Sequence, residues 1–360
     1  MSEQKDWVKT FLQLPLPFKV AIGAVVLIVI LVSMANRPNN PTERKDEDRG
    51  GDQVPAADAD GYLFCFWNLE NLFDDVDDEK RRPPDERYNR EFAQDVNLRA
   101  TKLGNLSKVL LSMNGGKGPD ILAVAELESD RALELLQDRL NSDLGERAAK
   151  YVHRLFREQK SGRHIAPGIL TRLPVDGNKT RQLGEHYHRI LEGHIRVNDR
   201  QLVVVVSHWT SRVQRPGGGH DESKNEEQRK KYADVIYGRF KAMYLANPRI
   251  SFTVSGDFND DPTDSSVVDH LRGTGDRTRL TSGDEPMLFN LAANRDLEKF
   301  GTLSHHNRWN LFDQILVSPA MLNDGDWTCD PTTFRTVREF SQNRRGRPWS
   351  FDEDDEGHRF

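Results

Sequence analysis

The chain has 360 residues, of which 36% are hydrophobic and 30% charged, a composition that excludes collagen-like, coiled-coil and wholly disordered proteins. Its 51 Lys and Arg residues against 57 Asp and Glu residues give a net charge of −6, so any polyanion must be bound locally rather than by a generally basic surface. The cysteines, Cys65 and Cys329, are too few for a disulfide framework or an all-cysteine zinc site.

An apolar run occupies residues 20–35, directly after Phe18 and Lys19. As a helix, residues 18–35 would extend about 27 Å, close to the roughly 30 Å of a hydrocarbon core. We therefore predict that residues 1–17 precede one transmembrane helix over 18–35, which anchors the protein to a membrane. Two alternatives remain: a signal segment cleaved after Ala35, where the residues are small, and a buried core helix. With an anchor, the soluble part is expected outside the cytoplasm, periplasmic or at the cell surface; with cleavage, it is secreted.

Residues 36–60 contain almost nothing that can be buried, so we predict a disordered linker there and a single folded domain over 61–360. In that domain, apolar and turn patterns alternate between strand and helix spacing. We expect strands over residues 62–68, 120–126, 150–156, 165–171, 192–197, 201–208, 251–256 and 311–318, and helices over 95–113, 130–144 and 222–245. The Asn198-Asp199 pair predicts a hairpin turn. The continuous apolar run 203–206 indicates a sheet covered on both faces, so we predict an α/β or α+β sandwich.

Four of these strands end in polar side chains that can do chemistry. Adjacent strand ends converge in space, whereas acidic residues on helix surfaces usually do not, so the repetition favours a functional site over a set of turn formers. The strand-end residues are Asn68 and Glu70, then Glu126, then His208, then Asp257 and Asn259.

In their order along the chain, these blocks resemble the endonuclease/exonuclease/phosphatase superfamily, in particular deoxyribonuclease I-like domains. The blocks are residues 67–71 (WNLEN), Glu126, residues 207–209 (SHW), 256–259 (GDFN) and 312–318 (FDQILVS). The resemblance covers about residues 61–360. It implies a four-layer sandwich of two mixed β-sheets flanked by helices, which hydrolyses phosphodiesters or phosphomonoesters with Mg²⁺.

Carboxylates of Glu70 and Glu126 are the expected metal ligands, because Mg²⁺ takes hard oxygen ligands and needs only one or two carboxylates besides water and substrate. The resemblance assigns the same pair, with Mn²⁺ or Ca²⁺ as other divalent ions that could serve. Glu128 is the nearest rival, since it lies two residues along and on the same face if the strand continues.

The remaining predicted roles concern the attacking water and the phosphoryl group. Asp257 is expected to act as the base that activates water, with Asn259 beside it to orient the water. His208 and Asn68 are expected to stabilise charge that develops on the phosphoryl oxygens. In the family, the residue at the position of Asp313 orients a second histidine.

That second histidine belongs to a Ser-Asp-His block, which this sequence lacks. Residues 346–360 contain one histidine, His358, which lies near the end of the chain and is not preceded by Asp. His358 is therefore a weak substitute for the second histidine. We therefore expect the domain to lack its last strand, which would expose a sheet edge. Two interpretations follow: an enzyme of the family, or a catalytically impaired binding module with the same fold.

An arginine-rich stretch over residues 335–347 and Arg212 favour nucleic acid as the substrate. The leading prediction is thus a membrane-tethered, metal-dependent phosphodiester hydrolase that acts as a nuclease. The enzymatic alternative is a phospholipid or inositol-phosphate phosphoesterase, which the apolar segment favours. No protein partner is implied.

Overall fold

The computed structural model describes residues 27–34, 61–78, 85–159, 162–185, 189–212, 222–280, 285–305, 308–323 and 325–337. Its helices are α2 (Asp85–Gln94), α3 (Val96–Leu111), α4 (Asp130–Leu144), α5 (Glu222–Ala246) and α6 (Leu297–Phe300). Its strands are β1 (Leu27–Met34), β2 (Tyr62–Leu72), β3 (Ile121–Leu127), β4 (His153–Phe156), β5 (Ala166–Thr171), β6 (Arg181–Gln182), β7 (Ile190–Val197), β8 (Arg200–His208), β9 (Phe252–Asp257), β10 (Gly273–Thr274), β11 (Leu288–Asn290), β12 (Leu303–His305), β13 (Arg308–Asn310), β14 (Asp313–Val317), β15 (Trp327–Cys329) and β16 (Arg335–Val337).

The first sheet has the order β15-β1-β2-β3-β5-β4, with β16 also paired to β1. Strands β2 and β3 run parallel, while β1 and β5 run antiparallel to their neighbours, so the sheet is mixed. Leucines of α3 and α4, among them Leu106, Leu110 and Leu136, pack with Leu122 and Val124 of β3 on the outer face of this sheet. This amphipathic packing explains why both helices form at the positions that their leucine spacing predicts.

The second sheet has the order β10-β11-β14-β9-β8-β7-β6 and is also mixed, because β8 and β9 run parallel between antiparallel neighbours. Helix α5 covers its outer face, where Ile236 and Phe240 pack against Val203 and Val205 of β8. Strand β8 is therefore buried on both faces, as its run of valines predicts.

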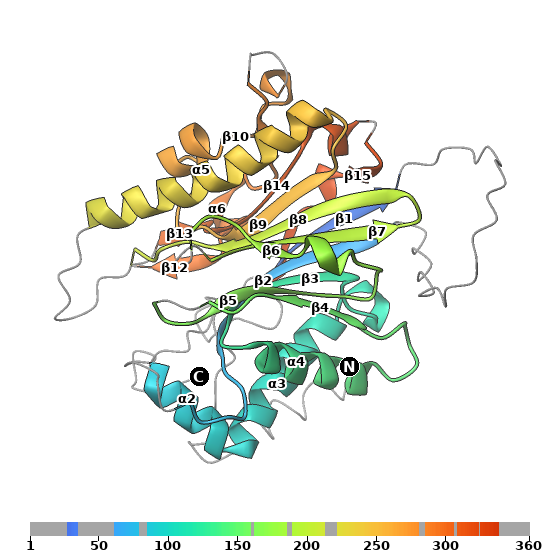
Figure 1. Ribbon diagram of the computed structural model, residues 1–360, viewed down its shortest axis with the longest axis vertical. Helices are drawn as coiled ribbons and strands as arrows, with labels where there is room; N and C mark the ends of the chain where they lie inside the picture. Colours follow the sequence, from blue (N-terminus) through green and yellow to red (C-terminus); the bar gives the residue numbers. More distant parts are fainter. Residues whose placement is uncertain are drawn as a thin grey trace.

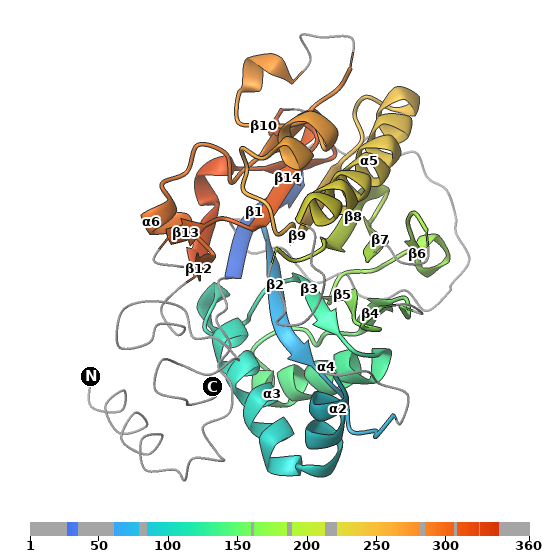
Figure 2. The ribbon, with the colours of Figure 1, turned by 90° about the vertical axis from the view of Figure 1, so that its left-hand side faces the viewer.

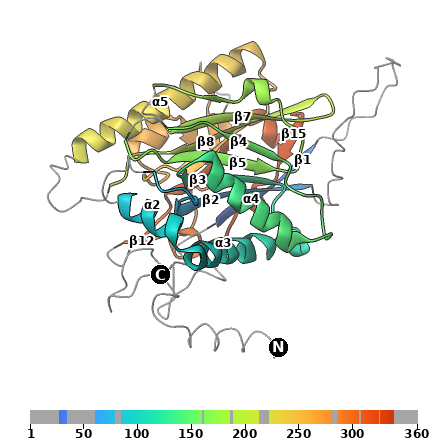
Figure 3. The same cartoon turned by 60° about the horizontal axis from the view of Figure 1, so that its bottom comes forward.

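The inner faces of the two sheets pack on each other through apolar side chains such as Phe64, Phe66, Ile195, Val204 and Val206. Helices lie outside on both sides, with α3 and α4 below the sheets and α5 above them (Figure 1). A view from the side and a view tilted towards the lower helices show the same layering (Figure 2, Figure 3). The predicted sandwich of two mixed sheets with flanking helices is therefore confirmed.

Most of the predicted elements are present with small shifts at their ends. Helix α4 has the predicted bounds, Ser129 caps it through the Ala132 amide, and Asp95 caps α3 through the amides of Asn97 and Leu98. The hairpin between β7 and β8 turns at Asn198, whose φ of 54° is the left-handed conformation that asparagine tolerates. The short helix α2 was not predicted.

The structure describes a strand, not the expected transmembrane helix, within the apolar run. Its residues 27–34 form strand β1, which pairs with β2 on one side and with β15 and β16 on the other. The sequence LIVILVSM is rich in β-branched residues and apolar apart from Ser33, so it suits a central strand as well as a helix in lipid. The rest of 18–35 lies outside the described residues. None of the helices that the structure describes is long and apolar enough to cross a membrane.

The register of β1 can be tested with a cysteine, because Val29 lies opposite the free, buried Cys65. Opposed residues of an antiparallel pair have Cα atoms about 4.5–5.5 Å apart, which suits a disulfide. We expect Val29→Cys to form an intramolecular disulfide with Cys65 in most molecules after mild oxidation, as read by non-reducing mass spectrometry of peptides. Leu31→Cys, which faces Leu63, should not form a disulfide with Cys65. Equal yields from both variants would contradict the register.

Candidate active site

The predicted polar residues meet where parallel strands of both sheets end. Asn68 of β2 lies beside Ala125 of β3 in the first sheet, one residue before Glu126. In the second sheet, His208 of β8 lies opposite Asp257 of β9, and Asp257 also lies opposite Asp313 at the start of β14. Because the two sheets pack face to face, these ends form one polar site at a rim of the sandwich.

Irregular backbone turns three of these side chains out of the regular strand pattern. Glu70, Glu126 and Asn259 have φ values of 47°, 63° and 51°, in the left-handed region that non-glycine residues seldom adopt. The pairing of β2 with β3 shifts register between Asn68 and Leu72, so Glu70 lies at a bulge. Bulges commonly re-aim side chains next to functional sites, and backbone strain clusters there.

Hydrogen bonds join the centre of the site. The Asn68 side-chain amide donates to Asp257 Oδ2 at 3.0 Å and lies 3.5 Å from Glu126 Oε1, while its Oδ1 accepts from the Glu70 amide. His208 Nε2 lies 3.6 Å from Glu126 Oε1 and 3.8 Å from Asp257 Oδ2. The backbone amide of Asn259 donates to Asp257 Oδ1 at 2.9 Å. Asp257 is therefore held from both sides, by one amide on each carboxylate oxygen.

Burial sets the protonation of these groups. It raises the pKa of Asp257 to about 6, against the opposing effect of its hydrogen bonds from Asn68 and Asn259. Burial, and then the nearby charges of Asp257 and Glu70, raise the pKa of Asp313 well above its usual range. Four carboxyl groups, those of Glu70, Glu126, Asp257 and Asp313, thus share one site.

His208 is affected in the opposite direction. Burial, followed by the positive charges of Arg189 and Arg163, lowers the pKa of His208 well below its usual value. The imidazole is therefore neutral at pH 7 and can donate or accept a hydrogen bond but brings no charge to the phosphoryl group. The predicted role of His208, to stabilise charge on the phosphoryl oxygens, would then rest on hydrogen bonding alone.

Glu128 and Asn259 each make a hydrogen bond that bears on their predicted roles. The rival ligand Glu128 is buried and its Oε2 accepts from the Asp74 amide at 2.9 Å, so it organises the loop after β2. The Asn259 side-chain amide donates to the Trp209 carbonyl at 3.2 Å, which leaves its oxygen for other contacts. His358 and the arginines beyond Arg335 lie outside the described residues.

Three basic residues that were not predicted from the sequence border the site. Lys102 of α3 donates to the Glu70 and Asn71 carbonyls, and burial lowers its pKa to about 8. Arg163 pairs with Asp85 and also donates to the Asn71 side chain. Lys102 lies at a buried position of α3, and a lysine at such a position is a signal for a specific role that could have been found from the sequence. Nothing in the sequence places Arg163 at the site.

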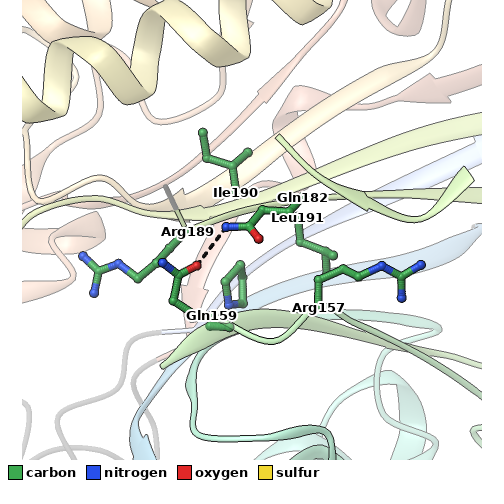
Figure 4. A pocket seen from close by; sticks show the side chains of 8 residues that line it. Arg157, Gln159, Gln182, Arg189, Ile190 and Leu191 are labelled. Carbon is green, nitrogen blue, oxygen red and sulfur yellow. Dashed lines mark hydrogen bonds between the residues drawn. The ribbon is translucent and has the colours of Figure 1, made fainter. Parts of the chain in front are cut away.

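The third is Arg189, which donates to the Trp209 carbonyl at 2.9 Å and accepts from the His208 amide through its own carbonyl. It also lines a shallow pocket between the sheets, whose other walls include Arg157, Gln159 and Gln182 (Figure 4). Figure 4 shows the two guanidinium groups directed away from each other, with a Gln182 to Gln159 hydrogen bond of 2.8 Å between them. The positive charge of Arg189 lies close enough to Asp257 to act on the pKa of that carboxyl group.

A hard divalent cation fits the donor set. Buried carboxylates repel one another here, and the Asp313 Oδ1 atom has no hydrogen-bond partner among the residues that the structure describes. Among the described residues, no group of three or more His, Cys, Asp or Glu side chains is placed so that it could hold a metal ion by itself. The arrangement suits an ion such as Mg²⁺, which takes one or two carboxylates and keeps several waters. That Glu70 and Glu126 hold such an ion stays a prediction from the sequence.

Known proteins were compared with the chain at the levels of sequence profile and structure. The profile described as "Endonuclease/Exonuclease/phosphatase family" matches residues 63–343. The comparison with curated proteins gave no match.

Solved structures with a similar arrangement include truncated TDP2 from Caenorhabditis elegans, at 16% identity over 60% of this chain and 75% of that chain, with a TM-score of 0.38. Beta toxin from Staphylococcus aureus with bound magnesium ions has 13% identity over 60% and 77% of the chains and a TM-score of 0.37. Sphingomyelinase C from Streptomyces griseocarneus has 12% identity over 60% and 92% and a TM-score of 0.35. Such low scores carry no argument about activity. The profile match, which spans most of the chain, shows that this protein belongs to the endonuclease/exonuclease/phosphatase family.

Proposed function

We propose that the protein is a divalent-metal-dependent phosphodiester hydrolase whose leading substrate is nucleic acid. The observation that carries the proposal is the convergence of Asn68, Glu126, His208 and Asp257, from four strands of two sheets, each with a polar atom within 3.8 Å of two others of the set. Family membership supports the class of reaction, and the arginine-rich stretch over 335–347 supports a polyanionic substrate.

In this proposal, Asp257 accepts the proton of the attacking water. The amides of Asn68 and Asn259 fix both oxygens of its carboxylate, so the base is oriented before substrate arrives. Neutral His208 and the Asn68 amide stabilise the phosphoryl oxygens by hydrogen bonding, and Arg189 contributes positive charge nearby. Bound at Glu70 and Glu126, Mg²⁺ would offset the charge of the phosphoryl group.

A membrane tether is a separate proposal, supported by the length and apolarity of residues 18–35. Residues 27–34 are paired within a sheet of the folded domain as β1, so they cannot hold that position and cross a membrane at the same time. Tethering, with the domain outside the cytoplasm, therefore requires β1 to leave the sheet. Val29→Cys protein bound to anionic vesicles should then form less of the Cys65 disulfide than protein in solution, and an unchanged yield would count against tethering.

Metal removal tests the hydrolase. We expect the release of acid-soluble nucleotide from plasmid DNA with Mg²⁺ to fall on the order of 10³-fold in EDTA, because the ion supplies several kcal/mol of charge stabilisation. Glu126→Gln should lower the rate even with Mg²⁺. Metal-independent cleavage, or an unaffected variant, would contradict the mechanism.

The substrate is decided by parallel assays. Release of soluble headgroup from sphingomyelin or phosphatidylinositol vesicles, without nucleotide release from DNA, would replace the nuclease by the lipid phosphoesterase. Metal-dependent binding of DNA or vesicles without any turnover would support the binding module.

A further inference from the structure

The turn formed by Glu70 and Asn71 has an unfavourable backbone that something must hold in place. Both residues have left-handed φ values, 47° and 62°, directly after the register shift in β2. For a glutamate such a conformation is unfavourable, and it persists only where the surrounding structure holds it in place. The position of the Glu70 carboxylate depends on this turn.

One side of the turn is held by groups already assigned to the site. The Glu70 amide donates to Asn68 Oδ1 at 3.0 Å, and the Asn71 amide donates to Glu126 Oε2 at 2.9 Å. These contacts engage the two N–H groups of the turn but not its two carbonyls.

Lys102 engages those carbonyls from the helix layer beneath the sheet. Its ammonium donates to the Glu70 carbonyl and, at 3.2 Å, to the Asn71 carbonyl, and it lies 5.5 Å from the centre of the Phe92 ring. The residue is only 2% exposed. A buried ammonium is strongly unfavourable unless hydrogen bonds and opposite charge compensate it, so a lysine that served only to fill space here would be a poor choice compared with leucine or methionine.

We propose that Lys102 is a positioning residue for the metal site, which acts through the Glu70–Asn71 turn. By holding two successive carbonyls, it fixes the backbone from which Glu70 projects, and through the Asn71 amide it also steadies Glu126. This inference rests on the proposed role of Glu70 and Glu126 as ligands. Outer contacts of this kind typically account for a 10- to 100-fold effect on metal affinity.

Lys102→Met tests the proposal, with Lys108→Met as the matched control on an exposed position of the same helix. Direct Mn²⁺ binding, measured by electron paramagnetic resonance of the free ion, should weaken about 10- to 100-fold in Lys102→Met and remain at the wild-type level in Lys108→Met. Hydrolysis should require correspondingly more Mg²⁺ for half-maximal rate. The KM for DNA at saturating Mg²⁺ should change little.

A double-mutant cycle separates positioning from general loss of stability. If Lys102 acts through Glu70, then adding Lys102→Met to Glu70→Gln should weaken Mn²⁺ binding much less than it does alone. Equal effects in both backgrounds, or wild-type binding by Lys102→Met, would overturn the inference. If Lys102→Met does not fold, it is replaced in the cycle by Lys102→Gln, which keeps one polar donor in the same place. Absence of Mn²⁺ binding by the wild type would instead refute the proposed metal-dependent function itself.

Discussion

Replacing Asp257 by Asn is expected to lower kcat about 10²- to 10⁴-fold, the range that a positioned general base contributes, with a much smaller change in KM. The amide keeps the shape of the side chain but cannot take a proton from water. Steady-state kinetics on a defined DNA duplex would measure the effect. Asp199→Asn, at a fully exposed position of the β7–β8 turn, is the matched control and should behave as the wild type.

Stability gives an independent readout for the same variant. Because the folded-state pKa of Asp257 is raised to about 6, the folded protein binds this proton more tightly than the unfolded chain, whose carboxyl titrates near 3.8. Ionisation of Asp257 therefore destabilises the metal-free fold as pH rises from about 4 to 6, and the full penalty is present above 6. Asp257→Asn removes it.

We accordingly expect metal-free Asp257→Asn to melt at a higher temperature than the wild type at pH 7.5, with the difference vanishing near pH 4. Thermal denaturation in EDTA at the two pH values measures this. In the wild type, kcat should also rise with pH through about 6 as the base ionises. A variant that lost activity and stability together at pH 7.5 would indicate a structural role for Asp257 instead.

Local patterns in the sequence were sufficient for the sandwich and for most of the site. The leucine spacing of α4 and the valine run of β8 reflect burial on one face and on two faces, which are properties of short segments. Parallel neighbours then bring strand ends together, so Asn68, Glu126, His208 and Asp257 could be expected to meet once their strands were recognised.

The unpredicted features depend on contacts between distant segments. The left-handed conformation of Glu70 and Glu126 is imposed by pairing between strands. It could not be predicted from the residue type, because glutamate does not favour this conformation. The place of β1 in the sheet was also not predicted, because an apolar run rich in β-branched residues suits a central strand and a transmembrane helix equally well. Helix α2 was missed because its buried face rests on little more than Tyr88 and Phe92.

Replacing Gly256 by Ala should destabilise the protein by about 3 kcal/mol or more, at the upper end of what overpacking costs, and lower Tm by roughly 5–10 °C. A Cβ at Gly256 would lie 2.1 Å from the Ser207 carbonyl oxygen and 2.8 Å from the Phe258 ring. The first of these is backbone of the central strand β8, which is paired on both sides and cannot move away. Thermal and urea denaturation would measure the loss.

Gly238→Ala is the matched control, because Gly238 lies within α5 and a Cβ there meets nothing within 4 Å. Alanine favours the helix by about 0.5–1 kcal/mol over glycine, so this variant should be more stable than the wild type. The same substitution, glycine to alanine, is thus expected to change stability in opposite directions at the two positions. Gly256 precedes Asp257 just as Ser207 precedes His208, so the close approach that excludes a side chain is also the one that aligns the base with the imidazole. If Gly256→Ala melted with the wild type, β8 and β9 would not approach in this register, and the placement of His208 beside Asp257 would be wrong.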